Sequence, residues 1–283
     1  MNKKRVIISG ASGFIGHHLV KKLLTANYEV IALSRGPEKA REGLPPGCSV
    51  AEWDGFSEEG WLQYADGAFA LVNLAGENLA SGIWTKDKKH KIIESRVYSG
   101  QAMLKAVEKS QVPPKVLVQA SATGFYGSQR DRILDEESPA GDDFLAEVCK
   151  VWENSPADVE NLGVRRVTIR QGLVLGADGG MMPLIILPFR FFAGGKLGNG
   201  RQWFSWIHIA DVVGAIQFLL ERSSLSGVFN LTAPTPVQAR LFFNQIARQM
   251  HRPSWLNIPS PVLEIFGGEM ARDTILASQR VLP

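Results

Sequence analysis

Short apolar runs alternate with amphipathic stretches over the first 176 residues. The runs contain few polar residues, as expected for parallel strands that are buried on both faces. They cover residues 6–9, 30–33, 49–52, 68–73, 115–119 and 166–170. Between them, apolar residues recur at helical spacing over 14–26, about 85–110 and about 143–161. Strands separated by helices of this length predict right-handed crossovers and a doubly wound parallel α/β sheet that is covered on both faces.

Beyond Gly176 the pattern becomes less regular, because glycine and proline interrupt an apolar region. The regular elements that remain are two helices and one strand, predicted at 209–220, 237–250 and 228–231. We therefore predict an α/β domain over residues 1–176 and a smaller C-terminal lobe over 177–283. Within that lobe, residues 208–231 are expected to return to the first domain.

The composition excludes several classes of protein. With 45% hydrophobic and 21% charged residues, the 283-residue chain is neither disordered nor a fibrous repeat. Its two cysteines, Cys48 and Cys149, cannot form a disulfide scaffold and suit a reducing compartment. The net charge of +3 is too small to indicate a nucleic-acid partner.

The sequence shows no export or membrane segment. The apolar run after the basic start is broken by glycines from Gly10 onward, and no small-residue cleavage site follows. The longest apolar stretch, 181–195, contains two prolines and an arginine, and it is shorter than the ~20 residues that a membrane helix needs. We expect a soluble, cytoplasmic protein that binds neither membranes nor nucleic acid.

The sharpest motif is Gly-Ala-Ser-Gly-Phe-Ile-Gly at 10–16, which follows a predicted strand and opens a predicted helix. Gly10 permits a tight turn, Gly13 lets backbone N–H groups approach a diphosphate, and Gly16 allows the helix to pack closely on the sheet. The start of the helix adds unpaired N–H groups and the positive end of its dipole. The motif predicts a dinucleotide site; the alternative is a glycine-rich turn that holds no ligand.

The residues at the end of the second strand indicate which dinucleotide is bound. Sites that prefer NAD place an acidic residue about 20 residues after the glycines, where it binds the ribose 2′-hydroxyl. Here that position holds Ser34 and Arg35, and no acid. A hydroxyl and a guanidinium suit a 2′-phosphate, so we favour NADP(H) over NAD(H). The alternative is a solvated surface arginine.

The glycine spacing resembles that of the extended short-chain dehydrogenase/reductase superfamily, and further motifs are similar to those of an atypical subgroup of it. These motifs are Asn73–Asn78, Glu94–Arg96, Ser121–Gly127, Trp152–Glu153, Arg170–Gly176, Gly198–Gln202, Trp206–Asp211, Asn230–Pro234 and Gln279–Pro283. The subgroup comprises epimerase-family proteins described as nucleoside-diphosphate-sugar epimerases, some of which are described as cell division inhibitors. The resemblance spans the whole chain. Because family members continue past a Leu-Pro like the last two residues, we expect a further C-terminal piece.

The resemblance implies a Rossmann-type NADP-binding domain followed by a substrate lobe, with NADP(H) lying along the carboxyl edge of the sheet. Carried over by position, the residues that contact the cofactor are Gly10, Ser12, Gly13, Phe14 and Ile15 at the diphosphate, Ser34 and Arg35 at the 2′-phosphate, Asp54 at the adenine, Leu74, Ala75 and Gly76 at the adenosine ribose and diphosphate, and Gln171, Gly172, Leu173 and Val174 near the nicotinamide.

The proton-transfer motif of the superfamily is missing. Its Tyr-x-x-x-Lys signature belongs on the helix after the fifth strand, where Lys150 is preceded four residues earlier by Ala146 and no tyrosine occurs. The usual active-site asparagine corresponds to Arg96. We expect Arg96 either to contact the cofactor or to pair with Glu77.

Ser121 corresponds to the catalytic serine of the superfamily, with Thr123 as the alternative. Three further side chains are candidates in place of the missing motif. Tyr126 lies at the end of the fifth strand, His208 has a reference pKa near neutrality, and Asp211 follows three residues later. Each has a structural alternative, which is packing for Tyr126, bridging of the two lobes for His208, and a helix cap for Asp211. No metal-ligand spacing is present.

Two functions are consistent with the sequence. The first is an NADP(H)-dependent oxidoreductase or epimerase that acts on a small polar molecule such as a nucleotide sugar. The second is a non-catalytic NADP(H) sensor or regulatory protein connected with cell division. A homodimer through two long helices is expected only by analogy with the superfamily.

Overall fold

A seven-stranded parallel sheet forms the centre of the molecule in a computed structural model that describes residues 3–283. The strand order is β11-β7-β5-β4-β1-β2-β3, and every neighbouring pair is parallel. The strands are β1 (Arg5–Ser9), β2 (Glu29–Ser34), β3 (Ser49–Glu52), β4 (Ala70–Asn73), β5 (Val116–Ala122), β7 (Arg165–Gln171) and β11 (Gly227–Leu231). The doubly wound parallel sheet predicted from the alternation of apolar runs and amphipathic stretches is confirmed.

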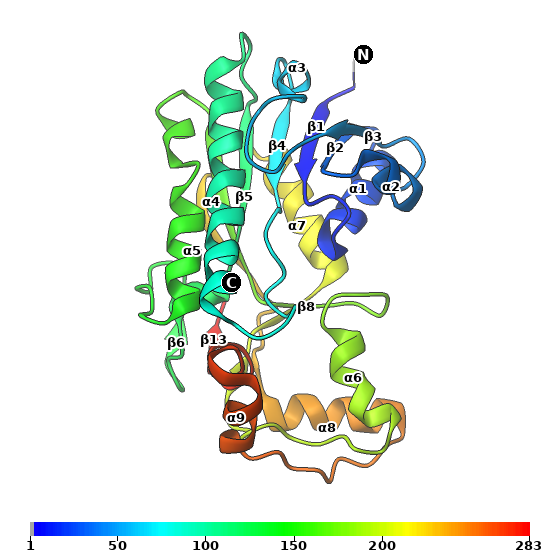
Figure 1. The fold of residues 1–283 in the computed structure, drawn as a ribbon, viewed down its shortest axis with the longest axis vertical. Coiled ribbons are helices and arrows are strands. Elements are labelled where there is room, and N and C mark those ends of the chain that lie inside the picture. Colours follow the sequence, from blue (N-terminus) through cyan, green and yellow to red (C-terminus); the bar gives the residue numbers. More distant parts are fainter. Residues whose placement is uncertain (1–2) are drawn as a thin grey trace.

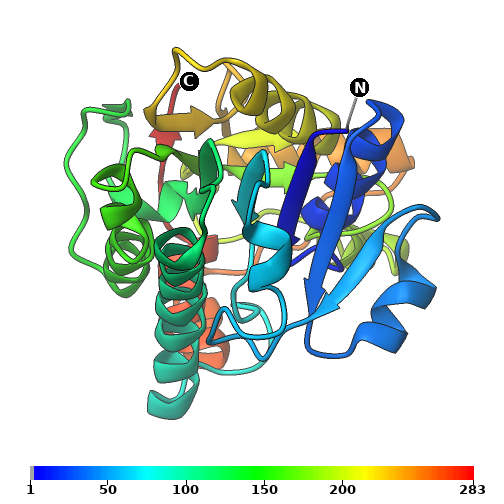
Figure 2. The same ribbon diagram turned by 90° about the horizontal axis from the view of Figure 1, so that it is seen from above.

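Helices cover both faces of this sheet (Figure 2). On one face, α1 (Phe14–Thr25) and α7 (Ile209–Glu221) bury side chains such as Leu19 and Ile216 against alternate residues of the strands. On the other face, α4 (Lys86–Lys109) and α5 (Phe144–Asn154) lie side by side (Figure 1). Both sides of each central strand are therefore buried, which explains the unbroken apolar runs in the sequence.

Capping residues and one proline set the ends of these helices. The Thr85 side chain accepts a hydrogen bond from the Lys88 N–H at the start of α4, and Asp143 accepts one from Ala146 at the start of α5. The helix predicted at 143–161 ends at Asn154, earlier than expected. Pro156 follows, and a proline cannot donate to the helical ladder and clashes with the preceding turn. A 3₁₀ turn, η2 (Ala157–Glu160), replaces the rest.

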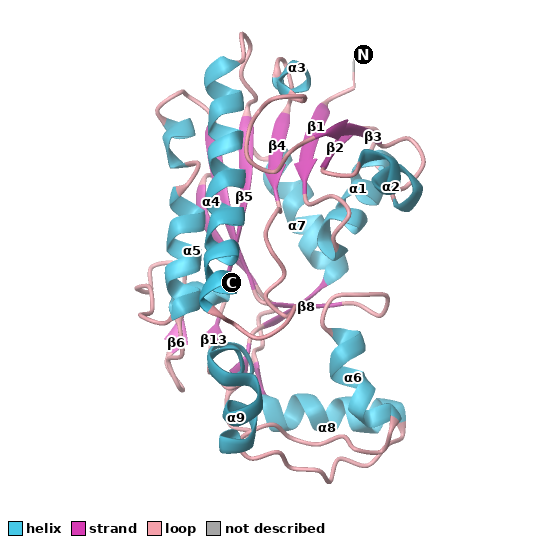
Figure 3. Cartoon of the chain, in the orientation of Figure 1, coloured by secondary structure: helices cyan, strands magenta, loops and turns pink. Residues whose placement is uncertain are grey.

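Short helices border the sheet, and a smaller lobe of helices and short strand pairs lies beyond it (Figures 1 and 3). Its helices are α6 (Met182–Arg190), α8 (Ala239–Met250) and α9 (Ser260–Met270), followed by a π-helical turn, η3 (Ala271–Ile275). The minor strands are β6 (Ile133–Leu134), β8 (Leu173–Leu175), β9 (Trp203–Phe204), β10 (Trp206–His208), β12 (Val237–Gln238) and β13 (Arg280–Val281). The helices that border the sheet are α2 (Pro37–Gly43), α3 (Leu62–Ala65) and the 3₁₀ turn η1 (Thr123–Tyr126).

The lobe has its own small apolar core, built around Phe189 and Phe243. The helix predicted at 237–250 begins two residues later, because β12 pairs with β9 before α8 starts. None of the helices within residues 3–283 is long and apolar enough to cross a membrane.

A layer of buried polar side chains lies on the α4–α5 face, where the strands approach their carboxyl ends. Ser9, Asn73 and Gln119 occupy one rung across β1, β4 and β5. The Ser9 hydroxyl donates to Asn73 Oδ1 at 2.6 Å, and Asn73 Nδ2 donates to Gln119 Oε1 at 2.9 Å and to the Ser99 hydroxyl of α4 at 3.2 Å. These bonds satisfy polar groups that would be costly to bury alone.

The next rung holds a buried ion pair. Arg170 of β7 lies between Ser121 of β5 and Asn230 of β11. Its Nε and Nη2 donate to the two carboxylate oxygens of Glu153 from α5 at 2.8 and 2.9 Å, and the Ser121 hydroxyl donates to the same carboxylate at 2.6 Å. Arg170 Nη1 donates to the Tyr126 hydroxyl, which donates to Asn230 Oδ1 at 2.7 Å. The pair thereby joins α5 to three strands.

Two ion pairs of β7 allow a matched test of this layer. We expect Glu153→Ala to lower the free energy of unfolding by roughly 3–5 kcal/mol, because it leaves the Arg170 guanidinium buried without a counter-charge. Glu160→Ala removes the exposed partner of Arg166 and should cost only about 0–1 kcal/mol. Urea denaturation of both variants measures the difference. Equal losses of stability would contradict this account of the layer.

Candidate functional site

The carboxyl edge of the sheet brings most of the predicted cofactor residues together. The loops after β1, β2, β4 and β7 all leave at this edge, which faces the smaller lobe in Figure 1. The strand order reverses between β1 and β4, because β2 and β3 add on one side and β4 on the other. In open α/β sheets, ligands bind outside the carboxyl ends at such a reversal.

The loop after β1 has no room for side chains at two of its glycines. Gly10 has φ +70°, and a Cβ added there would lie 2.8 Å from the backbone carbonyl of Leu74. A Cβ on Gly16 would lie 2.2 Å from the Gly10 carbonyl oxygen. Only glycine therefore allows the first turn of α1 to lie against the loop, and the loop against the chain after β4.

The start of α1 is open to an anion. Gly13 stands at the N-cap position without a side-chain cap, and the first turn contains no acidic residue. The first N–H groups of a helix have no intrahelical partner, and they lie at the positive end of the helix dipole. The cradle of Gly10 and Gly13 and these N–H groups fit a diphosphate.

Phe14 has a packing role that the motif alone does not show. A Cβ on Gly176, Gly179 or Gly180 would come within 3 Å of its ring, at 2.6, 2.6 and 2.9 Å. The loop after β8 therefore lies directly on the phenyl ring at the start of α1. His18 Nε2, one turn further along α1, lies 3.1 Å from the carboxylate of Asp178 in the same loop.

Ser34 ends β2 at the same edge, and Arg35 follows it. The Ser34 hydroxyl accepts a hydrogen bond from the Gly36 N–H at 3.2 Å. Arg35 is exposed and passes Gly55 of the loop after β3. Within residues 3–283, no carboxylate lies within 4.0 Å of the Arg35 guanidinium, which is consistent with a binding group for a phosphate.

The Asp54 carboxylate is engaged in its own turn. It accepts hydrogen bonds from the N–H groups of Phe56 and Ser57 at 2.7 and 2.8 Å, and from the Ser57 hydroxyl at 2.7 Å. Burial tends to raise the pKa of Asp54, but these hydrogen bonds outweigh it and hold the pKa below its usual value. Contact of Asp54 with an adenine stays a prediction.

Arg96 lies beneath the loop after β4. Leu74 and Ala75 lead to Gly76, where a Cβ would be 3.0 Å from Arg96 Cζ. A pair with the Glu77 carboxylate, one of the two alternatives for Arg96, is not formed. That carboxylate accepts from Lys88 Nζ at 2.5 Å, whereas Arg96 Nη1 donates to the Glu77 backbone carbonyl at 3.2 Å.

Unpartnered polar groups lie where β7 and β11 end. Gln171 Nε2 and the Thr232 hydroxyl are both buried without a hydrogen-bond partner, and Thr232 follows the residue paired with Gln171. Gly172 allows close packing, because a Cβ there would lie 2.5 Å from the Ser205 carbonyl oxygen. Leu173 and Val174 continue into β8, which pairs with β10. Thr232 was not among the predicted residues, since its position beside Gln171 depends on strand pairing.

The three hydroxyl candidates are already bonded within the protein. The Ser121 hydroxyl donates to Glu153, and the Thr123 hydroxyl donates to Gln279 Oε1 at 2.9 Å. Tyr126 is fully buried, with its hydroxyl bonded to Arg170 and Asn230. Burial outweighs these bonds and raises the pKa of Tyr126. The contacts favour the structural alternative for Tyr126, and a catalytic role for these residues stays a prediction.

His208 ends β10 and begins α7. Its Nδ1 accepts a hydrogen bond from the Ala210 N–H at 3.2 Å, so His208 itself caps the helix, while Asp211 lies exposed in the first turn. His208 is exposed and close to the end of β8, where it pairs with Leu175. Lys150 of α5 is also exposed and reaches only the Gly141 carbonyl, at 3.4 Å.

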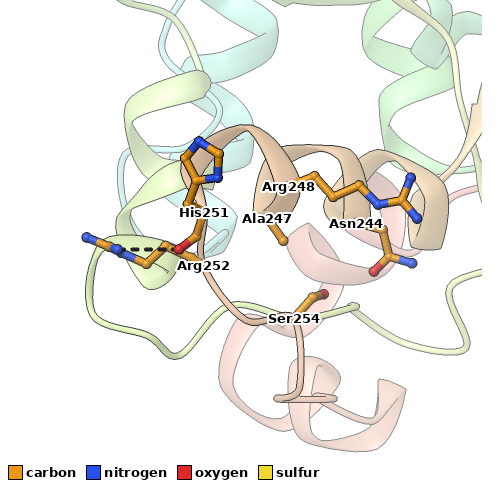
Figure 4. A pocket seen from close by; sticks show the side chains of 6 residues that line it. All are labelled: Asn244, Ala247, Arg248, His251, Arg252 and Ser254. Atoms are coloured by element: carbon orange, nitrogen blue, oxygen red, sulfur yellow. Dashed lines mark hydrogen bonds between the residues drawn. The ribbon is translucent and has the colours of Figure 1, made fainter.

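A surface depression lies away from this edge, at the end of α8 (Figure 4). Its lining residues are Asn244, Ala247, Arg248, His251, Arg252 and Ser254. Cations at a helix C-terminus are favoured by the helix dipole, which accounts for its two arginines. Within residues 3–283, no group of three or more His, Cys, Asp or Glu side chains is arranged to hold a metal ion.

Comparison with known proteins places these features in a family context. Residues 6–232 match the NAD dependent epimerase/dehydratase family. The chain is 40% identical to the "Epimerase family protein SDR39U1 homolog, chloroplastic" of Arabidopsis thaliana, over 98% of this chain and 80% of that protein. It is 38% identical to the "Epimerase family protein YfhF" of Bacillus subtilis, over 98% of this chain and 90% of that protein. The crystal structure of human epimerase family protein SDR39U1 with NADPH has a TM-score of 0.86 and 31% identity, covering 99% of this chain and 91% of that chain.

Two helical glycines test the close contact in the loop after β1. We expect Gly16→Ala to lower the free energy of unfolding by at least about 2 kcal/mol, because its Cβ would meet the Gly10 carbonyl oxygen. Gly214→Ala in α7 meets nothing within 4 Å and should raise stability by roughly 0.5–1 kcal/mol. Denaturant unfolding measures both. A neutral Gly16→Ala would show that the loop has more room than its geometry indicates.

Proposed function

The chain belongs to the NAD dependent epimerase/dehydratase family, and we propose that it binds NADP(H) along the carboxyl edge of the sheet and transfers hydride to or from a small polar molecule. The substrate would bind beyond this edge, on the side of the smaller lobe. A nucleotide sugar is the first class of substrate to examine, because it matches the chemistry of epimerases in the family.

One observation carries the proposal. The uncapped start of α1 and the glycine cradle lie where the strand order reverses, and Arg35 stands at the end of the adjacent β2. A dinucleotide with a 2′-phosphate needs both a diphosphate site and a cation near the adenosine ribose. The human relative SDR39U1, which was crystallised with NADPH, supports the choice of NADP(H).

The proposed cofactor contacts follow from position. The N–H groups at the start of α1 would hold the diphosphate, with Ser12 beside them, and Ser34 and Arg35 would hold the 2′-phosphate. Leu74 to Gly76 would border the adenosine ribose and diphosphate. The unpartnered Gln171 amide is a candidate donor near the nicotinamide. The bound nicotinamide would supply or accept the hydride, and the chain would orient it and limit access of water.

A second function is favoured by a specific observation. The helix α5 carries no tyrosine, and the hydroxyls of Ser121, Thr123 and Tyr126 are bonded within the protein. A chain that binds NADP(H) without a free proton donor would serve as a sensor or regulatory protein. His208 is the candidate that distinguishes the two functions, since its imidazole reaches solvent whereas Ser121 and Tyr126 are buried. A homodimer and a cytoplasmic location stay predictions.

The cofactor proposal is tested at Arg35. We expect Arg35→Ala to weaken NADPH binding by about 10- to 100-fold, because charge-assisted hydrogen bonds to the 2′-phosphate are lost. NADH binding should not change. Arg41→Ala removes an exposed arginine from the neighbouring α2 and serves as the control. Calorimetric titration gives the dissociation constants. Equal affinity of the unaltered chain for NADH and NADPH would contradict the 2′-phosphate site.

Turnover distinguishes the enzyme from the sensor. We expect the protein to turn over at least one compound from a panel of carbonyl compounds and nucleotide sugars. Reduction of a carbonyl compound is measured by loss of absorbance of the reduced nicotinamide. Epimerisation of a nucleotide sugar, which returns the hydride and leaves that absorbance unchanged, is measured by chromatography of the sugar. His208→Ala should lower this rate by about 10²-fold or more if the imidazole transfers a proton. Tight NADPH binding without turnover across the panel would favour the sensor.

A further inference from the structure

Arg96 is a buried cation that lacks a counter-ion. Its side chain extends from α4, is 6% exposed, and makes no ion pair within 4.0 Å among the residues that the structure describes. Burial lowers the pKa of Arg96 to about 10. Nearly all arginines that are this deeply buried have a paired carboxylate, because an isolated charge in the interior is costly.

The guanidinium has one occupied edge and one free edge. Nη1 donates to the backbone carbonyls of Glu77 and Ile92 at 3.2 and 3.0 Å. Nε is buried and has no partner, and Nη2 makes no hydrogen bond. The two nitrogens of this free edge carry parallel N–H groups, which is the arrangement that binds two oxygens of a carboxylate or phosphate at once.

The surroundings of the guanidinium pack against it and offer its free edge no acceptor. The Trp152 ring of α5 lies 4.7 Å from Arg96 Cζ, and the buried Trp152 Nε1 is a second donor without a partner. Gly76 lies on the guanidinium, where a Cβ would be 3.2 Å from Nη2. A side chain at position 76 would crowd Nη2, so glycine leaves the space beside this nitrogen unfilled by a Cβ.

We propose that Arg96 is an anion receptor of this site, which binds a phosphate or carboxylate group of a ligand through Nε and Nη2. The unmet donors and the uncompensated charge both call for oxygen acceptors that the protein does not supply. Two sources have this chemistry, the diphosphate of the dinucleotide and an acidic group of the substrate. Binding of the dinucleotide diphosphate rests on the proposed function. Binding of an acidic group of the substrate would mean that the substrate is an anion.

Two substitutions of Arg96 test the receptor. Arg96→Met keeps an apolar chain against Trp152 and removes the charge, whereas Arg96→Lys keeps the charge and removes the two-nitrogen edge. Arg165→Met is the matched control. Arg165 also donates to backbone carbonyls, those of Leu225 and Leu219, but it lies at the amino end of β7, away from the carboxyl edge of the sheet. Circular dichroism checks folding, and Arg96→Lys is used if Arg96→Met does not fold.

Calorimetric titration with three probes separates the two sources. The probes are NADPH, adenosine 2′-monophosphate, which has neither phosphate of the diphosphate, and malonate or inorganic phosphate added to NADPH-saturated protein. For a dinucleotide source, Arg96→Met weakens NADPH about tenfold or more and leaves the monophosphate unchanged. For a substrate source, it leaves NADPH unchanged and abolishes binding of malonate or phosphate. Arg96→Lys should give an intermediate loss, and Arg165→Met none.

The outcomes also separate this proposal from the preceding one. The receptor proposal would be wrong if the dissociation constant of every probe changed less than twofold in both Arg96 variants. The role of Arg96 would then be only to donate hydrogen bonds to the Glu77 and Ile92 carbonyls. A chain that binds no NADPH, but binds malonate or phosphate in an Arg96-dependent way, would overturn the proposed cofactor and leave the receptor standing.

Discussion

The ion pair between Arg170 and Glu153 is the interaction on which the carboxyl half of the sheet depends. It connects α5 to β7, and through Ser121, Tyr126 and Asn230 it extends to β5 and β11. Breaking such a pair leaves a buried charge, so the network keeps helix and strands in one arrangement. The loop that begins after Gln171 at the end of β7 starts directly beyond this layer, and its position rests on it.

The same network engages the hydroxyls of two residues that are candidates for catalysis at this edge. Inside the protein, the Ser121 hydroxyl donates a hydrogen bond to Glu153, and the Tyr126 hydroxyl donates one to Asn230. In a site that transfers protons, a hydroxyl must face the reacting atom and be free to exchange its proton. The layer therefore uses both hydroxyls to stabilise the fold, and His208 and Asp211 are the catalytic candidates that are exposed.

Arg96 contrasts with Arg170, although both are buried arginines at the same end of the sheet. Arg170 has two carboxylate oxygens opposite its Nε and Nη2, whereas the corresponding edge of Arg96 has no partner. The two arginines are similarly buried but differ in their partners. Arg170 therefore stabilises the fold, whereas Arg96 has donors left to bind a ligand. Gly76 and the glycines of the loop after β1 have a related role, since a Cβ at Gly76, Gly10 or Gly16 would crowd the Arg96 guanidinium or the neighbouring backbone.

The sequence by itself determined the parallel sheet, the loop at Gly10 to Gly16 and the position of Arg35, because these depend on local periodicity, on backbone freedom and on the end of one strand. It did not determine the partners of Glu153, Arg96 or Tyr126, nor the helix α9, whose apolar residues lack a clear amphipathic spacing. Those partners lie on different strands and helices, up to 104 residues apart for Tyr126 and Asn230. Only tertiary packing decides such contacts, since the energy of a buried polar group depends on which group the fold brings opposite it.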